Sequence, residues 1–300
     1  MIKRSVGEYI FDTINVILLL CIAFITLYPF WYVLVASLSN PDAVAAGRVY
    51  FWPAGELGNY LAPWNFEWSA YERVMAIPNI WTAYGNTIYI TVMGTLISLS
   101  VMSLGAYALS KKRLRGRTFF TWIMIITMWF NAGTMPMYLN FKNLGLLDNR
   151  WALILGFAVS AFYVILLRTY FENVSDSLEE SAKMDGANDW LVFFRIYLPL
   201  SVPALMTVGL YCFVDRWNAY LWAMILLKDQ NKIPLQVLLR SLVVKVTMTT
   251  ETMVGLDTSQ FNEQTIVYAT IMVAVIPMLL LYPFIQRFFV KGIMLGAVKG

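Results

Sequence analysis

Polar and charged side chains inside an apolar run are the residues of this chain best suited to chemistry. The run at 201–227 contains an acid and a base followed by aromatic and amide groups: Asp215, Arg216, Trp217, Asn218, Tyr220 and Trp222. Burying such groups in lipid is costly, so they usually face a cavity or a partner. Flat aromatic faces beside hydrogen-bonding groups suit sugar rings and hydroxyls. We therefore interpret this segment as a candidate contact for a polar solute.

The adjacent charges Asp215 and Arg216 allow two interpretations. Arg216 could attract acidic sugars such as uronates. Alternatively, both residues could form ion pairs with neighbouring helices or with a partner subunit, because adjacent residues point about 100° apart on a helix. We prefer the second, structural interpretation.

A second polar group lies in the earlier apolar run, 118–139. Its members surround Gly133 and Pro136, and they are Asn131, Thr134, Tyr138 and Asn140. This combination predicts an interrupted helix that lines a cavity, because irregular backbone at membrane depth is tolerated there. A packing kink without contact to a solute is the alternative.

The chain lacks the residue groups that most enzymes and metal sites need. It has no His, and Cys21 and Cys212 lie in separate apolar runs, as expected of packing residues. No GxxxxGK[ST] run occurs, so the chain is not expected to bind or hydrolyse ATP. We predict that this chain is not an enzyme and holds no cofactor or metal. Nucleic-acid binding has no support either.

Composition indicates what positions these residues. Of the 300 residues, 59% are hydrophobic and only 13% are charged, which is typical of a membrane protein. An apolar helix of about 20 residues crosses a hydrocarbon core about 30 Å thick. The predicted fold is all-α and polytopic, a single domain over 1–300 with about six transmembrane helices, at approximately 11–37, 83–109, 118–139, 151–171, 201–227 and 265–289.

The distribution of basic residues predicts the orientation in the membrane. The sequence KKRLRGR at 111–117 follows the second predicted span, and such segments remain on the cytoplasmic side. Both termini and the loop 172–200 are then cytoplasmic. The segments 38–82 and 228–264 lie outside, and in the second of these LQVLLRSLVVKV predicts a short amphipathic helix.

Small residues four positions apart occur in two of the predicted spans. Gly94 is paired in this way with Ser98, and Gly156 with Ser160. Such pairs let helices approach closely. We predict a packing role for them and no other.

The cytoplasmic loop 172–200 has the pattern of two short helices joined by a turn. Ser177 and Glu180 have capping-box spacing, so the first helix is predicted to begin at Ser177. It should end at Gly186, whose missing Cβ suits a left-handed terminus. Asn188 or Asp189 can cap the second helix, which is predicted to end before Pro199.

The second helix of this loop is rich in aromatic residues: it carries Trp190, Phe193, Phe194 and Ile196. Together with the charged first helix, it predicts a docking surface on the inner face of the membrane. A surface helix that merely closes the loop is the alternative.

The residues of this loop resemble the EAA signature of the permease subunits of binding-protein-dependent ABC importers. They are Glu180, Ser181, Ala182, Asp185, Gly186, Ala187, Phe194, Ile196, Leu198, Pro199 and Pro203. Ser181 replaces the first alanine of the signature and is small enough to preserve the surface. Residues 8–300 resemble the carbohydrate-importer branch of that family, which takes up oligosaccharides or polysaccharides. The Asp-Arg pair before Trp217 departs from the family pattern, in which this position usually carries less charge.

The resemblance implies a type I ABC importer permease fold with a cytoplasmic coupling helix. In the family this helix docks on an ATP-binding subunit. Glu180 would offer a charged contact, Ala182 would permit close approach and Gly186 would form the turn. The implied contact residues are Glu179, Glu180, Ser181, Ala182, Asp185, Gly186 and Ala187.

The resemblance also implies the partners. These are a second, different permease subunit, two cytoplasmic ATP-binding subunits that hold ATP and Mg, an extracellular solute-binding lipoprotein and the lipid membrane. We therefore expect a multi-pass protein of the bacterial plasma membrane that forms half of the pathway for an oligosaccharide or polysaccharide. An acidic saccharide would fit Arg216.

Two alternatives to this expectation remain. The first is an ABC permease for a solute other than a sugar. The second is a stand-alone secondary transporter, which would need its own ion-coupling site and internal repeats, and neither is evident in the sequence.

Overall fold

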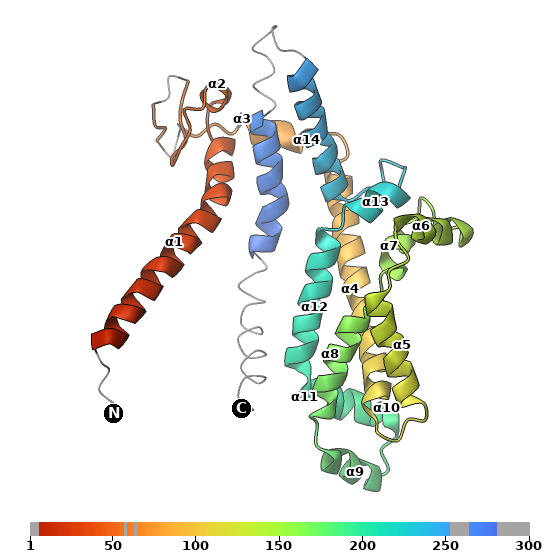
Figure 1. Cartoon of the computed structure of the whole chain (residues 1–300). Coiled ribbons are helices and arrows are strands. Elements are labelled where there is room, and N and C mark those ends of the chain that lie inside the picture. The colour runs from red at the N-terminus through yellow and green to blue at the C-terminus, as the bar shows by residue number, and fades with distance from the viewer. Residues whose placement is uncertain (1–5, 57–58, 63–64, 253–263, 281–300) are drawn as a thin grey trace. The chain divides into compact units, whose positions relative to one another are not determined.

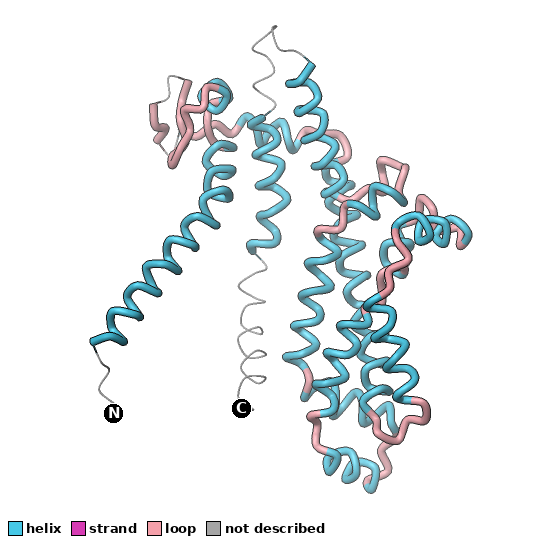
Figure 2. Tube along the Cα trace, viewed as in Figure 1, coloured by secondary structure: helices cyan, strands magenta, loops and turns pink. Residues whose placement is uncertain are grey.

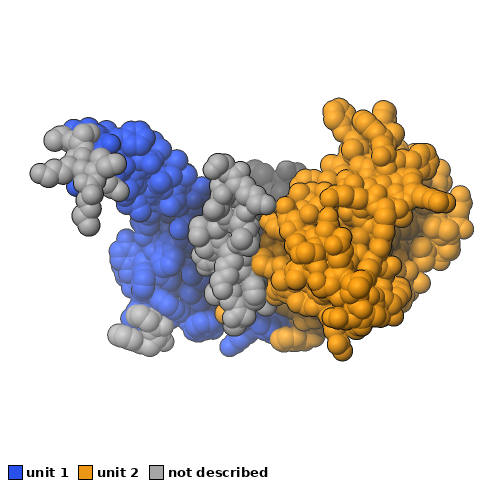
Figure 3. All heavy atoms as spheres, turned by 90° about the horizontal axis from the view of Figure 1, so that it is seen from below, with its two compact units in different colours: residues 1–78, 239–276 blue, residues 79–238, 277–300 orange. Residues whose placement is uncertain are grey.

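The computed structural model describes residues 6–56, 59–62, 65–252 and 264–280. Helices dominate these residues (Figures 1 and 2). Ala54 and Tyr60 form an isolated antiparallel bridge. The chain divides into two compact units, which Figure 3 draws in blue and orange. Unit 1 comprises Met1–Pro78 and Leu239–Ile276, and unit 2 comprises Asn79–Leu238 and Pro277–Gly300. The predicted all-α fold is confirmed.

Unit 1 is built around α1 (Val6–Ser37), which is followed by the short helices α2 (Pro41–Ala45) and α3 (Ser69–Met75). α2 begins where the Asn40 side chain accepts a hydrogen bond from the backbone of Asp42, and proline at the first helical position suits this cap. Only the C-terminal end of α1 is buried within the chain. Along the rest of α1 the apolar side chains are exposed, as expected of a surface that lipid or a partner covers.

Unit 2 is organised by its longest helix, α4 (Ile80–Ser110). It packs against α7 (Arg150–Leu155), α8 (Ala161–Glu172) and α12 (Val202–Trp217). α5 (Arg117–Trp129) packs on α8. Small residues are frequent on the buried side of α4, which permits close helix packing.

Three of the predicted spans are broken rather than continuous. In 118–139, α5 ends at Trp129, and α6 (Thr134–Asn143) begins after Gly133, whose φ is +84°. The predicted interruption is therefore confirmed. In 151–171 the unpredicted break at 156–160 separates α7 from α8, and in 201–227 α12 is followed by the separate helix α13 (Leu221–Leu226).

Two described helices are long and apolar enough to cross a membrane by themselves, namely Gly7–Ser37 of α1 and α4. The bent pair Asp189–Leu200 and Val202–Trp217 could provide a third span. A further apolar helix is described over Gln264–Leu280, and the end of the predicted span 265–289 lies outside the described residues. The number of six spans stays a prediction.

The segment after α13 is tied to the start of α4. The Asn86 side chain donates hydrogen bonds to the carbonyls of Asn231 and Ile233, at 2.8 and 3.0 Å. Thr87 accepts one from the backbone of Leu235 at 2.8 Å. Leu235 begins α14 (Leu235–Thr252), so the predicted helix at LQVLLRSLVVKV is confirmed and is longer than expected.

Candidate functional site

The first helix of the loop 172–200 is α9 (Asp176–Met184), which lies at the end of unit 2 opposite α13 (Figure 1). The prediction that Ser177 caps it is wrong, because the helix begins one residue earlier, with Ser175 as the N-cap. The Ser177 hydroxyl instead lies 2.8 Å from that of Ser175. Asp176 and Glu179 occupy the first turn, where negative charge favours a helix start.

Gly186 ends this helix as predicted. Its φ of +84° is in the left-handed region that favours glycine. The Ala187 N–H donates to the Ala182 carbonyl at 2.9 Å, which closes the helix end. A Cβ at Gly186 would meet no atom within 4 Å, so any cost of substitution there is conformational.

The second helix begins where predicted but continues further. The Asn188 side chain accepts a hydrogen bond from the Leu191 N–H at 2.9 Å and caps α10 (Asp189–Val192). The helix then continues through a π-helical turn, Phe193–Tyr197, into α11 (Leu198–Leu200). The predicted end before Pro199 is therefore wrong. Proline lacks the N–H that a regular α-helix needs at this position, and a π-helical turn changes the hydrogen-bond pattern so that this N–H is not required. The chain bends by 81° only after Leu200.

Most of the predicted contact residues of the loop are on the surface. Glu180, Ser181, Asp185 and Gly186 are exposed, whereas Ala182 and Ala187 are half-buried and pack on the hydrophobic core of unit 2. Large apolar side chains are exposed around them: Leu178, Met184, Trp190 and Phe194. An exposed patch of charged and large apolar residues is typical of a protein interaction surface.

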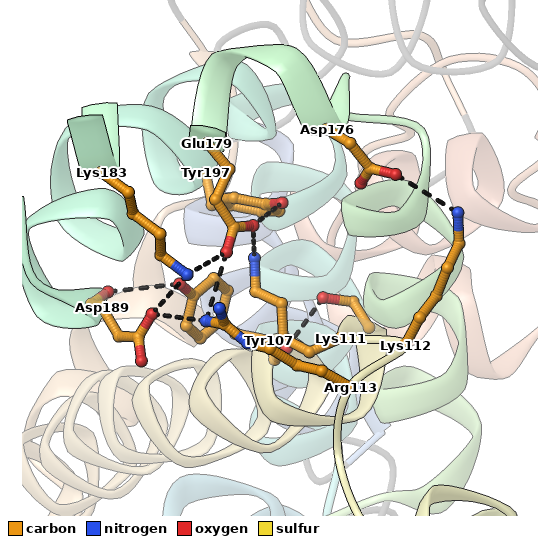
Figure 4. Close-up of polar contacts among 10 residues, drawn as sticks. Tyr107, Lys111, Lys112, Arg113, Asp176, Glu179, Lys183, Asp189 and Tyr197 are labelled. Carbon is orange, nitrogen blue, oxygen red and sulfur yellow. Dashed lines mark hydrogen bonds and ion pairs between the residues drawn. The ribbon is translucent and has the colours of Figure 1, made fainter. Parts of the chain in front are cut away.

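Glu179 is the exception, because its carboxylate points into the protein (Figure 4). It accepts hydrogen bonds from Lys111, from Lys183 at 2.6 Å and from the Tyr197 hydroxyl at 2.9 Å. Burial favours a higher pKa for Glu179, but these hydrogen bonds outweigh it and lower the pKa to about 2. Glu179 is therefore an internal anion rather than part of the exposed surface.

The second candidate site is a cavity of about 410 Å³ in unit 2. Its wall includes residues of α4 and α12 and the break between α7 and α8. Three predicted solute contacts, Asp215, Arg216 and Trp222, are among its lining residues. Tyr163 and Ser98 line it as well, although no local pattern in the sequence marks them as solute contacts.

The Arg216 side chain is 9% exposed and binds the interrupted helix. Nη1 donates to the Leu153 carbonyl at 2.8 Å, and Nη2 donates to the Phe157 carbonyl at 3.0 Å and the Ser98 hydroxyl at 2.7 Å. These carbonyls belong to α7 and to the break that follows it. A cation is favourable at a helix C-terminus, where carbonyls are unpaired. Arg216 thus stabilises the interruption of 151–171 by binding carbonyls beside it.

The small residues of α4 make room for this guanidinium. A Cβ at Gly94 would lie 2.6 Å from the Arg216 side chain, and Ser98 is a direct hydrogen-bond acceptor. Their predicted packing role therefore includes the accommodation of a charged group. Asp215 accepts a hydrogen bond from the Tyr163 hydroxyl at 2.9 Å. The Tyr163 ring stacks on that of Tyr211, with centroids 5.8 Å apart.

The other predicted pathway residues do not line this cavity. Trp217 is buried and stacks on Phe213, and the Asn218 side chain donates to the Val214 carbonyl at 3.0 Å. Asn131 is exposed and accepts a hydrogen bond from the backbone of Gly133, Tyr138 is half-buried, and Tyr220 is partly exposed. From the 131–140 segment it is Met137 that reaches the cavity. Contact of these residues with a solute stays a prediction.

The chain matches known proteins along nearly its whole length. Residues 9–295 match the family described as binding-protein-dependent transport system inner membrane component. The polygalacturonan/rhamnogalacturonan transport system permease protein YtcP of Bacillus subtilis is 41% identical over 297 residues, which cover 97% of this chain and 99% of YtcP. Protein LplC of the same organism is 36% identical over 291 residues, covering 97% and 95%.

A solved structure is similar to the same extent. It is a chain in the crystal structure of a bacterial ABC transporter involved in the import of the acidic polysaccharide alginate. The TM-score is 0.84 at 41% identity, and the match covers 96% of this chain and 100% of the other. This similarity supports the predicted permease fold.

Proposed function

This chain belongs to the binding-protein-dependent transport system inner membrane component family, and from that premise we propose that it imports an acidic polysaccharide or its oligosaccharides. It is a membrane transport component rather than an enzyme. In the proposed importer it forms half of the membrane pathway, beside a second permease subunit. A solute-binding lipoprotein delivers the saccharide from outside.

The cavity lined by Arg216 is the main support for the proposal of an acidic substrate. Its wall combines the guanidinium with the aromatic faces of Tyr163 and Trp222 and the hydroxyl of Ser98. Aromatic faces pack against sugar rings, and a cation attracts carboxylates. Among the described residues, the hydrogen bonds of Arg216 go to neutral carbonyls and a hydroxyl. The neighbouring Asp215 also lines the cavity, but its carboxylate accepts a hydrogen bond from Tyr163 and forms no ion pair with Arg216 among those residues, so we assign the attraction of an anion to Arg216. YtcP is named for the transport of polygalacturonan and rhamnogalacturonan, and the similar solved chain belongs to a transporter involved in the import of the acidic polysaccharide alginate, which supports this assignment.

The surface of α9 supplies the proposed contact with the ATP-binding subunits. We place α9 and both chain termini on the cytoplasmic side, since the basic residues of 111–117 adjoin α9. ATP and Mg are held by the partner subunits in this proposal. Glu180, Ser181 and Asp185 are exposed next to Met184 and Trp190, a mixture suited to a protein groove. Closure of the ATP-binding subunits would bias the permease between its outward-facing and inward-facing states.

Reconstitution tests this proposal. The assembled complex in proteoliposomes, with its binding protein, should import a uronate oligosaccharide only when ATP is supplied. A neutral oligosaccharide of equal length serves as the matched comparison and should be imported more slowly. Uptake without ATP would indicate a secondary transporter, and equal uptake of both saccharides would contradict the acidic substrate.

A further inference from the structure

The Glu179 carboxylate is the meeting point of three separate segments. Lys111 comes from the end of α4, Lys183 from α9 itself and Tyr197 from the π-helical turn (Figure 4). Arg113 adds a fourth group, with its Nη2 3.3 Å from the carboxylate. Glu179 is therefore the residue through which α9 is attached to the helices on either side of it.

Lys111 is held as firmly as its partner. Its Nζ lies over the rings of Tyr107 and Tyr197, 4.2 and 3.7 Å from their centroids. The two rings contact each other edge to face, 4.9 Å apart, and pack with Phe171 and Phe193. The side chains of Lys111 and Glu179 are each only 12% exposed. A buried, multiply bonded pair such as this fixes the relative position of two helices.

A neighbouring ion pair shows the contrast. Lys112 Nζ lies 3.3 Å from Asp176, but these side chains are 81% and 73% exposed. Exposed pairs of this kind contribute little to stability, because water screens them and both side chains lose freedom. The two pairs connect the same two segments, so Lys112 and Asp176 provide a matched control for Lys111 and Glu179.

Lys111 connects the buried pair to the cavity through α4. Lys111 is the residue at which α4 ends, and α4 packs on α7, α8 and α12. Ser98 and Met102 of α4 line the cavity itself. A displacement of α9 would reach those residues along a continuous, rigid helix.

We propose that Glu179 is a positioning residue that locks α9 to the end of α4, so that movement imposed on α9 by an ATP-binding subunit reaches the cavity. We call Glu179, Lys111 and Tyr197 the Glu179 clamp. This inference rests on the proposed function, and it assigns Glu179 a role different from that of the exposed Glu180. Glu180 contacts the partner subunit, whereas Glu179 connects α9 to α4, so that a displacement of α9 also displaces α4.

The first test replaces Glu179 in the assembled transporter. Glu179→Gln keeps the shape of the side chain and removes its charge, and the exposed surface of α9 is unchanged. ATP-binding subunits should still co-purify with the variant. The measured quantity is the number of ATP molecules hydrolysed per saccharide imported in proteoliposomes. This ratio should rise by about fivefold or more, because typical coupling free energies correspond to factors of that size. Asp176→Asn makes the same chemical change on the same helix and should leave this ratio unchanged.

Two further variants separate transmission from folding. Tyr197→Phe removes one hydrogen bond to Glu179 and keeps the ring under Lys111, so the ratio should rise in the same direction but less. Lys111→Met should raise it as Glu179→Gln does. The double variant Glu179→Gln/Lys111→Met should be no worse than the more impaired single variant, because both changes break one connection.

Several results would overturn the clamp. One is a wild-type ratio in both Glu179→Gln and Tyr197→Phe. Another is a proportional loss of uptake and ATP hydrolysis in these variants, since this would indicate a structural role alone. A third is a double variant Glu179→Gln/Lys111→Met in which the effects of the two single changes on the ratio of ATP hydrolysed to saccharide imported multiply, as independent effects would. Failure of the wild-type complex to couple uptake to ATP would instead contradict the proposed function, which keeps the two failures distinct.

Discussion

Arg216 has a structural role, and we propose an electrostatic role for the same side chain. Its guanidinium donates hydrogen bonds to the carbonyls of Leu153 and Ile154 in α7 and of Phe157 in the break at 156–160, near a helix end where carbonyls need partners. The same guanidinium lines the cavity. Within the described residues the structural role takes the form of hydrogen bonds to neutral groups rather than the ion pairs expected from the sequence. Different substitutions can separate this role from the proposed attraction of an acidic sugar.

Arg216→Gln should lower both the stability of the protein and the uptake of acidic oligosaccharides. Loss of charged hydrogen bonds at a buried position costs about 3 kcal/mol. Arg216→Lys loses the planar fork but keeps the charge, so it should be destabilised similarly and should retain more of the preference for acidic over neutral saccharide. Melting temperatures and paired uptake assays measure the two effects. Arg195→Gln, at an exposed position, is the control.

Equal loss of acidic and neutral uptake in Arg216→Gln would show that this residue acts only through the structure. The acidic substrate would then depend on other groups of the pathway.

The low pKa of Glu179 predicts how its contribution to stability depends on pH. Burial opposes the shift, but the hydrogen bonds prevail and lower the pKa from 4.5 to about 2. A lowered pKa means stabilisation that is present above pH 4.5 and is lost as the pH falls toward 2. The melting-temperature difference between wild type and Glu179→Gln should therefore be constant from pH 8 to 5 and shrink at lower pH. The melting temperature of Asp176→Asn should differ little from that of wild type throughout. If the difference between wild type and Glu179→Gln changed between pH 8 and 5, the lowered pKa of Glu179 would be contradicted.

At the scale of elements, the turn after α9 depends on one backbone conformation. Gly186→Val forces a β-branched residue into the left-handed region, at a cost of about 1–2 kcal/mol, although no atom obstructs its Cβ. We expect membrane insertion to be retained and saccharide uptake per ATP to fall. Gly186→Asn is the control, since asparagine tolerates this conformation. Wild-type coupling in Gly186→Val would show that the turn does not position α9.

The sequence predicts those parts of this loop that depend on local chemistry. Gly186 and Asn188 act through their own backbone or the next few residues, and both predictions are confirmed. The cap at Ser177 fails because Ser175 has extended backbone and Asp176 already begins the helix, although the Ser175 side chain forms no capping hydrogen bond. The π-helical turn at Phe193–Tyr197 could not be predicted, since Pro199 can either end a helix or be accommodated by a wider turn.

Features that depend on contacts between distant residues are those that the sequence does not reveal. Glu179 and Glu180 are adjacent and chemically identical, and only the packing of α9 decides which one faces Lys111. The break at 156–160 lies in a continuous apolar run, and Arg216 stabilises it from more than fifty residues away in the sequence. Hydropathy reports neither relation.

At the scale of the whole molecule, unit 1 depends on its surroundings. Side chains such as Phe11 and Ile25 are each 68% exposed along α1. So large an apolar surface is stable only when lipid or another subunit covers it. The chain should therefore be extracted from membranes only by detergent.

Cysteine labelling tests this membrane placement and the proposed orientation. Cys21 is exposed on α1, whereas Cys212 is buried. In intact membranes a water-soluble maleimide should not label Cys21, because the reagent does not enter the lipid, and denaturation in SDS should expose both cysteines. With Ser181→Cys, label should react in inside-out vesicles and not in intact cells. Glu56→Cys should show the reverse, and labelling of Ser181→Cys in intact cells would invert the topology.

The space beside Gly94 links two positions that are far apart in the sequence. A single methyl group at Gly94 would lie 2.6 Å from the Arg216 side chain, so any side chain at this position requires Arg216 to move or to be replaced. The residues at positions 94 and 216 should therefore covary among relatives. Across an alignment of relatives, a side chain at the position of Gly94 should coincide with loss of the long cation at the position of Arg216, and a continuous helix should then replace the break at 156–160.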